Sequence, residues 1–340
     1  MSSSETVSDT GQALRDPKRP RDVALRESDR ERAPLSERVG RHETCVLTVV
    51  IPARDEEADL PQVIRGVREV LRADARPCHE IVVVDDGSTD GTAQAARELG
   101  VRVVRHPYGI GNGAAVKAGL RCARGVVTVL LDGDGQHDPD DIPRLLEGLA
   151  RAPLVVGART GGGSSLHRHL ANRAYNLLAS YVANRRIPDL TSGFRAVRTD
   201  VARRFLYLLP NGFSYPSTLT LSLLRSGHPV LFVPVQVRKR RKGTSSKIKI
   251  FRDGSRFLLL IARVATFFSP LKVFLPLSLL VFGLGFGYYL YTYFVSHRFT
   301  NMGLLLLVLG ALVLSLGLVS EQVASLRFEK AESGWEEEST

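Results

Sequence analysis

Two long uncharged segments near the C-terminal end restrict the folds that this chain can adopt. They cover residues 274–295 and 302–320, which are 22 and 19 residues long, and only six residues separate them. An α-helix rises about 1.5 Å per residue, so about 20 apolar residues cross the roughly 30 Å hydrocarbon core of a bilayer. A pair of buried helices in a soluble protein is the alternative. The length of both segments and their short connection favour a transmembrane hairpin.

The charges that flank this hairpin predict its orientation. Residues 238–256 contain nine Lys/Arg and one Asp, whereas the loop between the two segments contains only Arg298 and His297 as basic residues. Positive charge collects on the cytoplasmic side of membrane proteins. We therefore expect a multi-pass protein of the cytoplasmic (inner) membrane whose soluble part is cytoplasmic. The net charge of +11 also indicates an anionic partner, such as nucleic acid, a phosphorylated substrate or a membrane surface.

Before the hairpin, apolar strands alternate with helices. Short segments rich in Val, Ile and Leu at 46–51, 80–85, 101–104 and 126–131 predict four strands, the first of them ended by Pro52. Helices are predicted between them, at 60–71, 91–99 and 113–123. This alternation predicts an α/β fold with a mostly parallel sheet, in which ligands bind beyond the carboxyl ends of the strands.

Changes in composition divide the chain into five segments. Residues 1–44 hold nine Lys/Arg and nine Asp/Glu with almost no apolar pattern, which predicts a disordered arm without the apolar core of a signal peptide. The α/β domain follows at 45–237, and a basic juxtamembrane segment with an interfacial helix at 238–268. We expect the two spans at 269–325 and an acidic tail at 326–340.

Acidic residues cluster where the predicted strands end, above all in LLDGDGQHDP at 130–139. An EF-hand is excluded because its sixth and twelfth positions, counted from Asp132, would be His137 and Pro143. No Walker A loop is present. GIGNGA at 109–114, with Asp132 about 20 residues further on, fits a dinucleotide-binding fingerprint. That fingerprint belongs on the first strand–helix turn of a fold, and here two units precede it.

A divalent metal is the favoured explanation for Asp132 and Asp134. Carboxylate oxygens on a loop suit Mg²⁺ or Mn²⁺ that also binds substrate phosphates. A solvated acidic turn is the alternative. For Asp138, which precedes Pro139, we favour a helix-capping role over a metal site.

Four motifs, taken together and in this order, carry a resemblance to a known family. They are VVIPARDEEADL, VVVDDGSTDGT, LLDGDGQHDP and DLTSGFR. The chain resembles family 2 glycosyltransferases with the GT-A fold. With two spans after the domain, it is similar to the polyprenyl-phosphate glycosyltransferases, the group that contains dolichyl-phosphate mannose synthase. The resemblance covers about residues 46–325.

This resemblance implies a donor site at the strand ends. Asp132 and Asp134 would hold the metal on a nucleotide-sugar diphosphate, with Gln136 as a third ligand and Asp134 as a catalytic residue. The donor nucleotide would meet Pro52, Ala53, Glu56, Asp85, Asp86, Gly113, Lys117 and Asp132. The alternative for Lys117 is that it is a solvated helix residue that does not bind the nucleotide. The family's common form is P-x-Y-N-E, from which this chain departs at Arg54 and Asp55.

The resemblance also implies an acceptor site. The acceptor phosphate would be bound by Ser192, Arg195, Arg238, Arg240, Ser246 and Lys247, with Arg195 as a catalytic residue. Arginine suits phosphate because it forms bidentate hydrogen bonds. Asp189 has an alternative as a structural cap or arginine partner. The alternative for the basic segment is that it anchors the chain on anionic lipid. It could do this and bind the acceptor phosphate as well.

The function implied is metal-dependent, inverting transfer of a sugar from a UDP- or GDP-linked donor to polyprenyl phosphate. The expected partners are the nucleotide-sugar, polyprenyl phosphate and the bilayer, with homo-oligomers left open and no nucleic acid. Two alternatives stay open. A processive polysaccharide synthase normally needs more spans and a Q-x-x-R-W motif, which we do not find in this sequence. A non-enzymatic, membrane-anchored nucleotide-sugar-binding protein is the other.

Overall fold

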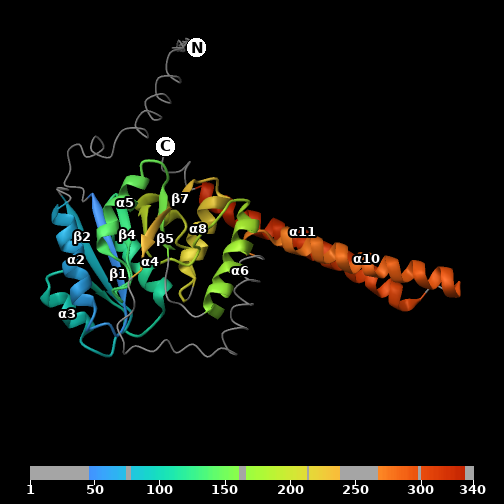
Figure 1. Ribbon diagram of the computed structural model, residues 1–340, viewed down its shortest axis with the longest axis horizontal. Coiled ribbons are helices and arrows are strands. Elements are labelled where there is room, and N and C mark those ends of the chain that lie inside the picture. Colours follow the sequence, from blue (N-terminus) through green and yellow to red (C-terminus); the bar gives the residue numbers. More distant parts are fainter. Residues whose placement is uncertain are drawn as a thin grey trace, which may run out of the picture. The chain divides into compact units, whose positions relative to one another are not determined.

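The protein is described by a computed structural model that covers residues 46–73, 78–160, 166–212, 214–237, 267–297 and 300–333 (Figure 1). Several predictions therefore lie outside the described residues. They are the N-terminal arm at 1–44, the basic segment at 238–266 with Arg238, Arg240, Ser246 and Lys247, and the last residues of the acidic tail from 334 onwards.

Within these described ranges, seven strands form one sheet in the order β3-β2-β1-β4-β6-β5-β7. The four predicted strands are β1 (Leu47–Ala53), β2 (His79–Asp85), β3 (Arg102–Arg105) and β4 (Val127–Leu130), and they pair in parallel. Their carboxyl ends therefore meet at one edge. This confirms the mostly parallel α/β sheet.

Strand β1 does not end at Pro52, as the sequence had suggested, but continues through Ala53. Pro52 is paired with Val84 of β2, whereas the register of β1 with β4 stops at Val50 opposite Leu130. Beyond that point β1 has a strand neighbour on one side only. A proline, which has no N–H to donate, is tolerated where a strand has such a free side.

Strand β6 (Arg195–Arg198) is the exception to the parallel arrangement. It runs antiparallel to β4 and to β5 (Leu154–Thr160), while β7 (Val230–Gln236) pairs in parallel with β5. Arg195 lies opposite Leu130 in one register and opposite Val156 in the other. The segment that precedes β6 consequently lies at the edge where β4 and β5 end.

The helices cover the sheet with apolar faces. Helix α2 (Leu60–Ala73) buries its apolar residues at helical spacing, as predicted: Leu60, Val63, Ile64, Val67 and Leu71. The other helices that the described residues form before the hairpin are α3 (Thr92–Glu98), α4 (Asn112–Cys122), α5 (Ile142–Gly148), α6 (Leu166–Ala183), α7 (Thr199–Arg204) and α8 (Tyr215–Arg225). A short 3₁₀ turn, η1 (Pro139–Asp141), precedes α5, and the Asp138 carboxylate caps it by accepting from the Asp140 N–H.

The two apolar segments form helices α10 (Pro270–Ser296) and α11 (Asn301–Ser333), which lie side by side as a hairpin (Figure 1). Both are long and apolar enough to cross a membrane. Large apolar side chains such as Leu279, Leu284 and Phe294 are exposed on them. Helix α11 continues to Ser333, past residue 325, where we had expected the second span to end.

Small residues allow the two hairpin helices to approach closely. A Cβ atom on Gly285 or Gly310 would lie 2.8 or 3.0 Å from a side-chain atom of the facing helix. The Ser278 hydroxyl on α10 donates to the Gly310 carbonyl oxygen on α11 at 2.8 Å. Close packing around glycines and an interhelical hydrogen bond are common sources of association between helices in membranes.

Polar contacts attach the base of the hairpin to the α/β domain. The Lys272 ammonium on α10 donates to the Tyr181 and Val182 carbonyl oxygens at 3.1 and 2.8 Å and to Asn184 Oδ1 at 2.9 Å. These acceptors lie at and just beyond the C-terminal end of α6, where unpaired carbonyls carry partial negative charge. Lys272 therefore satisfies the end of a helix that belongs to the α/β domain.

The Lys272→Met variant should lose stability. The substitution keeps much of the apolar stem but leaves the α6 carbonyls without a charged donor, and such hydrogen bonds contribute about 1.5–3 kcal/mol each. We expect the melting temperature in detergent to fall by roughly 3–10 °C. The exposed Arg186→Met, a neighbouring loss of one positive charge, is the matched control. Equal melting temperatures for the two variants would contradict this role of Lys272.

Candidate active site

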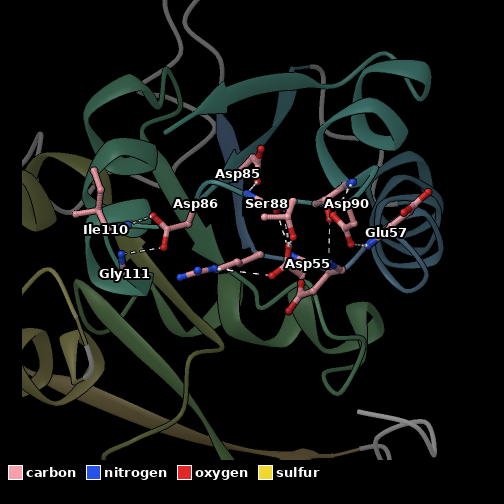
Figure 2. Close-up of polar contacts among 12 residues, drawn as sticks. Asp55, Glu57, Asp85, Asp86, Ser88, Asp90, Ile110 and Gly111 are labelled. Carbon is pink, nitrogen blue, oxygen red and sulfur yellow. Dashed lines mark hydrogen bonds and ion pairs between the residues drawn. The ribbon is translucent and has the colours of Figure 1, made fainter. Parts of the chain in front are cut away.

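The polar loops that follow β1 and β2 are joined to each other by reciprocal hydrogen bonds (Figure 2). The Asp55 carboxylate accepts from the Thr89 N–H at 2.8 Å, and the Asp55 N–H donates to the Ser88 hydroxyl at 3.0 Å. Glu57 exchanges a second pair of bonds, with the Gly91 N–H at 2.9 Å and with the Asp90 carboxylate at 3.2 Å. Asp55, one of the two departures from the family motif, is thus a structural clamp with a left-handed backbone (φ 55°).

Asp85 is the last residue of β2 and Asp86 follows it; both are predicted to meet the nucleotide, but their side chains contact different partners (Figure 2). The Asp85 carboxylate accepts from the Ser88 N–H at 2.9 Å and pairs with Arg105 Nε at 3.0 Å. The Asp86 carboxylate accepts from the Ile110 and Gly111 N–H groups at 3.0 and 2.8 Å.

Asp86 also contacts His106 Nδ1 at 2.8 Å. Burial raises the pKa of Asp86, but the hydrogen bonds from His106 and from the two backbone amides outweigh it and keep the pKa below its usual value. Asp86 therefore organises the loop that leads into α4. Its contact with the nucleotide stays a prediction, as does that of Asp85.

Glycines in neighbouring loops give the side chains of the first loop room to approach. The Arg54 guanidinium lies against Gly109, and the Glu56 carboxylate lies against Gly133, at positions that a Cβ atom on either glycine would occupy. Gly133 is the middle residue of the D-x-D motif. The structure thus brings Glu56, predicted to bind the donor, to the proposed metal ligands. Pro52 and Ala53 are buried at the end of β1 beneath them.

Asp132 and Asp134 follow β4 directly. The carboxylate of Asp132 lies against Gly193, where a Cβ atom would overlap it, so the D-x-D loop touches the DLTSGFR segment. Burial, and secondly the charge of Asp134, raise the pKa of Asp132 to about 6, while Arg195 and Arg159 act in the opposite direction. Two neighbouring carboxylates that repel each other in a partly buried loop are suited to a cation.

The residues around the D-x-D pair fit a metal ion whose ligands come partly from the protein and partly from the substrate. Within the described part of the chain, no group of three or more His, Cys, Asp and Glu side chains gathers to hold a metal ion. Asp134 accepts a hydrogen bond from the Gln136 N–H at 3.1 Å, so Gln136 lies in the same turn. Mg²⁺ is typically held by one or two carboxylates together with waters and substrate phosphates. This donor set suits that mode and not a closed protein cage.

Lys117 and Gly113 on α4 contact the loop before α8. The Lys117 ammonium donates to the Leu209 carbonyl oxygen at 3.1 Å and to the Asn211 side-chain oxygen. Gly113 lies so close to the Pro210 carbonyl oxygen that a Cβ atom would overlap it. Lys117 is a partly exposed residue of α4 whose ammonium binds the neighbouring loop. Contact of Lys117 and Gly113 with the nucleotide stays a prediction.

Arg159, near the end of β5, was not predicted as a site residue from the sequence. Its guanidinium forms two hydrogen bonds with the Asp189 carboxylate, at 2.7 and 2.9 Å, and a third with the Thr191 hydroxyl. The alternative in which Asp189 partners an arginine is confirmed. A basic residue at the carboxyl end of a strand was the signal that could have identified Arg159.

Arg195 is fully buried and bonds to neutral groups. It donates to the Pro216 carbonyl oxygen at 2.9 Å, to the Thr220 hydroxyl at 3.3 Å and to the Ser192 carbonyl oxygen. Burial lowers the pKa of Arg195, although a guanidinium stays charged in proteins. Ser192 is buried as well. The structure thus places both residues inside the protein, and their direct binding of the acceptor phosphate stays a prediction.

A cavity of about 150 Å³ lies between the D-x-D loop and the start of α8. Apart from Asp132, the residues that line it are uncharged: Asn112, Asp132, Thr191, Gly193, Gly212, Ser214, Tyr215, Pro216 and Ser217. Ser214 has a left-handed backbone (φ 88°). Strained backbone of this kind is frequent at binding sites.

His137 is a second residue that the sequence analysis did not assign. It is buried and its ring lies 5.2 Å from that of Phe194, centroid to centroid. Burial, and secondly the nearby charge of Arg159, lower the pKa of His137 to about 4, so the ring is neutral at physiological pH. It packs the D-x-D loop onto the segment that precedes β6.

Two family models match this chain, one in the α/β domain and the other in the hairpin. Residues 48–206 match glycosyl transferase family 2, and residues 269–326 match the GtrB C-terminal hairpin. A solved structure of glucosyl-3-phosphoglycerate synthase from Mycobacterium tuberculosis, in complex with Mn²⁺ and UDP-glucose, superposes with a TM-score of 0.53 at 23% identity. It covers 68% of this chain and 82% of that chain, and at this identity the likeness shows the GT-A fold alone.

Two curated relatives are more similar in sequence. Undecaprenyl-phosphate mannosyltransferase from Micrococcus luteus is 33% identical over 215 residues, which are 59% of this chain and 86% of that protein. Polyprenol monophosphomannose synthase from Mycolicibacterium smegmatis is 32% identical over 214 residues, which are 58% of this chain and 79% of that protein. With this similarity, the sheet topology and the D-x-D loop, the chain belongs to glycosyl transferase family 2 and is a glycosyltransferase.

Proposed function

We propose that this protein transfers a sugar from a nucleotide-sugar to a polyprenyl phosphate at the cytoplasmic face of a membrane, with the help of Mg²⁺ or Mn²⁺. One observation carries the proposal: the D-x-D loop contacts the DLTSGFR segment at Gly193, beside a cavity, in a chain that ends in an apolar hairpin. The names of the two relatives supply the acceptor class, because both refer to a polyprenyl phosphate.

The acceptor supplies its own nucleophile. A phosphate monoester has a second pKa of about 6, so one of its oxygens is available as an anion near neutral pH. This oxygen attacks the anomeric carbon while the bond from that carbon to the diphosphate oxygen breaks. The nucleoside diphosphate leaves with the electron pair, and the attack from the opposite side inverts the anomeric carbon. A protein base is therefore not required.

The chain's own residues would position the departing diphosphate. Asp132, Asp134 and Gln136 would hold the divalent ion on the donor phosphates. A bound divalent ion stabilises the negative charge of a departing diphosphate as a Lewis acid. Pro52, Ala53, Glu56, Asp85 and Asp86 would form the wall on the nucleotide side, because they lie at or just beyond the carboxyl ends of β1 and β2, which are both on the same side of β4 in the sheet.

The hairpin supports the membrane location of this chemistry. Its helices α10 and α11 expose apolar side chains, and Lys272 and Glu321 attach its base to α6 and α8. The acceptor lipid would then reach the site from the membrane surface. The basic segment at 238–256 favours the cytoplasmic side for the catalytic half.

The Asp134→Asn variant should lose sugar transfer by roughly a hundredfold or more, since the amide is a neutral and poorer ligand for a hard cation. Asp138→Asn is the matched control within the same motif, because Asp138 caps η1 and asparagine caps as well. The assay is transfer to undecaprenyl phosphate from a panel of UDP- and GDP-sugars, with EDTA and with Mg²⁺ or Mn²⁺ restored. Full activity of Asp134→Asn, or of wild type in excess EDTA, would refute the metal assignment.

The connection between α10 and α11 should be accessible from outside the cell. After removal of the native cysteines, Thr300→Cys should react with a membrane-impermeant maleimide on intact cells. Glu338→Cys, beyond the second span, should react only after permeabilisation. The reverse pattern, or labelling of both positions in intact cells, would show that the catalytic half does not face the cytoplasm.

A further inference from the structure

The first turn of α8 forms one wall of the cavity. Helix α8 has 11 residues, and Ser214, at its N-cap position, makes no side-chain capping hydrogen bond. Tyr215, Pro216 and Ser217 line the cavity. The first N–H groups of a helix have no partner within it and carry partial positive charge, which attracts anions.

The Ser217 side chain gives a second, independent indication of a ligand. Ser217 is fully buried, lines the cavity, and its hydroxyl oxygen forms no hydrogen bond with any residue that the structure describes. It lies near enough to the Tyr175 hydroxyl to influence that group's pKa, but without hydrogen-bond geometry. A buried hydroxyl without a partner is costly, and a bound acceptor atom would remove that cost.

Arg195 places a positive charge directly beneath this turn. It bonds to the Pro216 carbonyl oxygen and the Thr220 hydroxyl, both on α8. Among the described residues, its hydrogen bonds reach no carboxylate, and Asp132 and Asp189 influence it only through space. A buried charge without a bonded counter-ion is unfavourable, and an anion at the α8 N-terminus would compensate it.

We propose that the first turn of α8 binds the phosphate group of the acceptor lipid, with the Ser217 hydroxyl and the Tyr215 and Ser217 amides as donors and Arg195 as the supporting charge. The proposal rests on the function proposed above and gives it an acceptor subsite. It also assigns a role to Arg195, which acts through α8 without touching the phosphate. Arg195 is thus a positioning residue.

A phosphate at this position could come from the acceptor or from the donor diphosphate. The contacts of α8 favour the acceptor. Arg225, the last residue of α8, pairs with Glu321 of α11 at 3.1 Å, so the helix that lines the cavity also touches the base of the apolar hairpin. Eleven residues span about 16 Å, a short path from the membrane anchor to the cavity. The donor phosphates, in contrast, belong with Asp132 and Asp134.

The test compares Ser217→Ala with Ser222→Ala in the full-length protein in detergent. Ser222 lies on the same helix, is fully buried, and its hydroxyl also lacks a partner among the described residues, but it does not line the cavity. Binding of farnesyl phosphate, farnesol, UDP and GDP is measured by calorimetry, together with the melting temperature. Neither substitution removes a hydrogen bond within the described fold, so neither variant should lose stability.

We expect Ser217→Ala to bind farnesyl phosphate about tenfold or more weakly, with nucleotide affinity within twofold of wild type. Ser222→Ala should change neither affinity, and Ser217→Thr, which keeps the hydroxyl, should restore phosphate binding. Weakened nucleotide binding in Ser217→Ala would assign the turn to the donor and overturn the proposal. So would identical behaviour of the two alanine variants, or equal affinity of wild type for farnesol and farnesyl phosphate.

The same measurements separate this proposal from the proposed function. If wild type transfers no sugar to undecaprenyl phosphate from any donor, the proposed function fails. The loss of farnesyl phosphate binding in Ser217→Ala still decides whether the first turn of α8 recognises a phosphate monoester. If transfer occurs and the KM for undecaprenyl phosphate is unchanged in Ser217→Ala, the function stands and the acceptor subsite lies elsewhere.

Discussion

The antiparallel pairing of β6 with β4 is the constraint on which the rest of the site depends. Because Arg195 pairs with Leu130, the residues that follow β4 and those that precede β6 occupy the same edge of the sheet. Asp132 thereby reaches Gly193, and Arg195 reaches the start of α8. A parallel β6 would place the DLTSGFR segment at the opposite edge, away from the D-x-D loop. The register matters equally, since a shift by one residue turns every side chain of a strand to the other face.

The elements that could be predicted from the sequence are those whose apolar residues form a local pattern. Short segments rich in Val, Ile and Leu identified β1 to β4, helical spacing identified α2, and uncharged length identified α10 and α11. The contacts that it missed join residues far apart in the chain. Lys117 meets Asn211 across 94 positions, and Arg159 meets Asp189 across 30. Neither contact produces a repeating pattern in the sequence. A single sequence does not distinguish a lysine or arginine that is solvated from one that bonds to a distant residue.

The first loop shows how a departure from a family motif can be absorbed by the structure. At the position where the common form P-x-Y-N-E has asparagine, Asp55 fixes the second loop through the Thr89 amide, and Glu57 and Asp90 add a further pair of bonds. Arg54, at the tyrosine position of that form, extends its guanidinium over Gly109. The acids of the first two loops therefore direct hydrogen bonds to groups within the protein, whereas Asp132 of the D-x-D loop lines the cavity.

Glu321 has a consequence for how the chain is assembled. Its carboxylate accepts from the Leu271 N–H at 3.1 Å and pairs with Arg225, so its two partners belong to α10 and to α8. The α/β domain and α10 are synthesised before α11, which means that both partners exist when Glu321 leaves the ribosome. Glu321 lies directly after the uncharged run of α11, and a charge at the end of such a run is expensive to leave unpaired. The last helix to be synthesised therefore gains both partners of Glu321 only when the domain and α10 have already reached their places, which couples closure of the hairpin to folding of the domain.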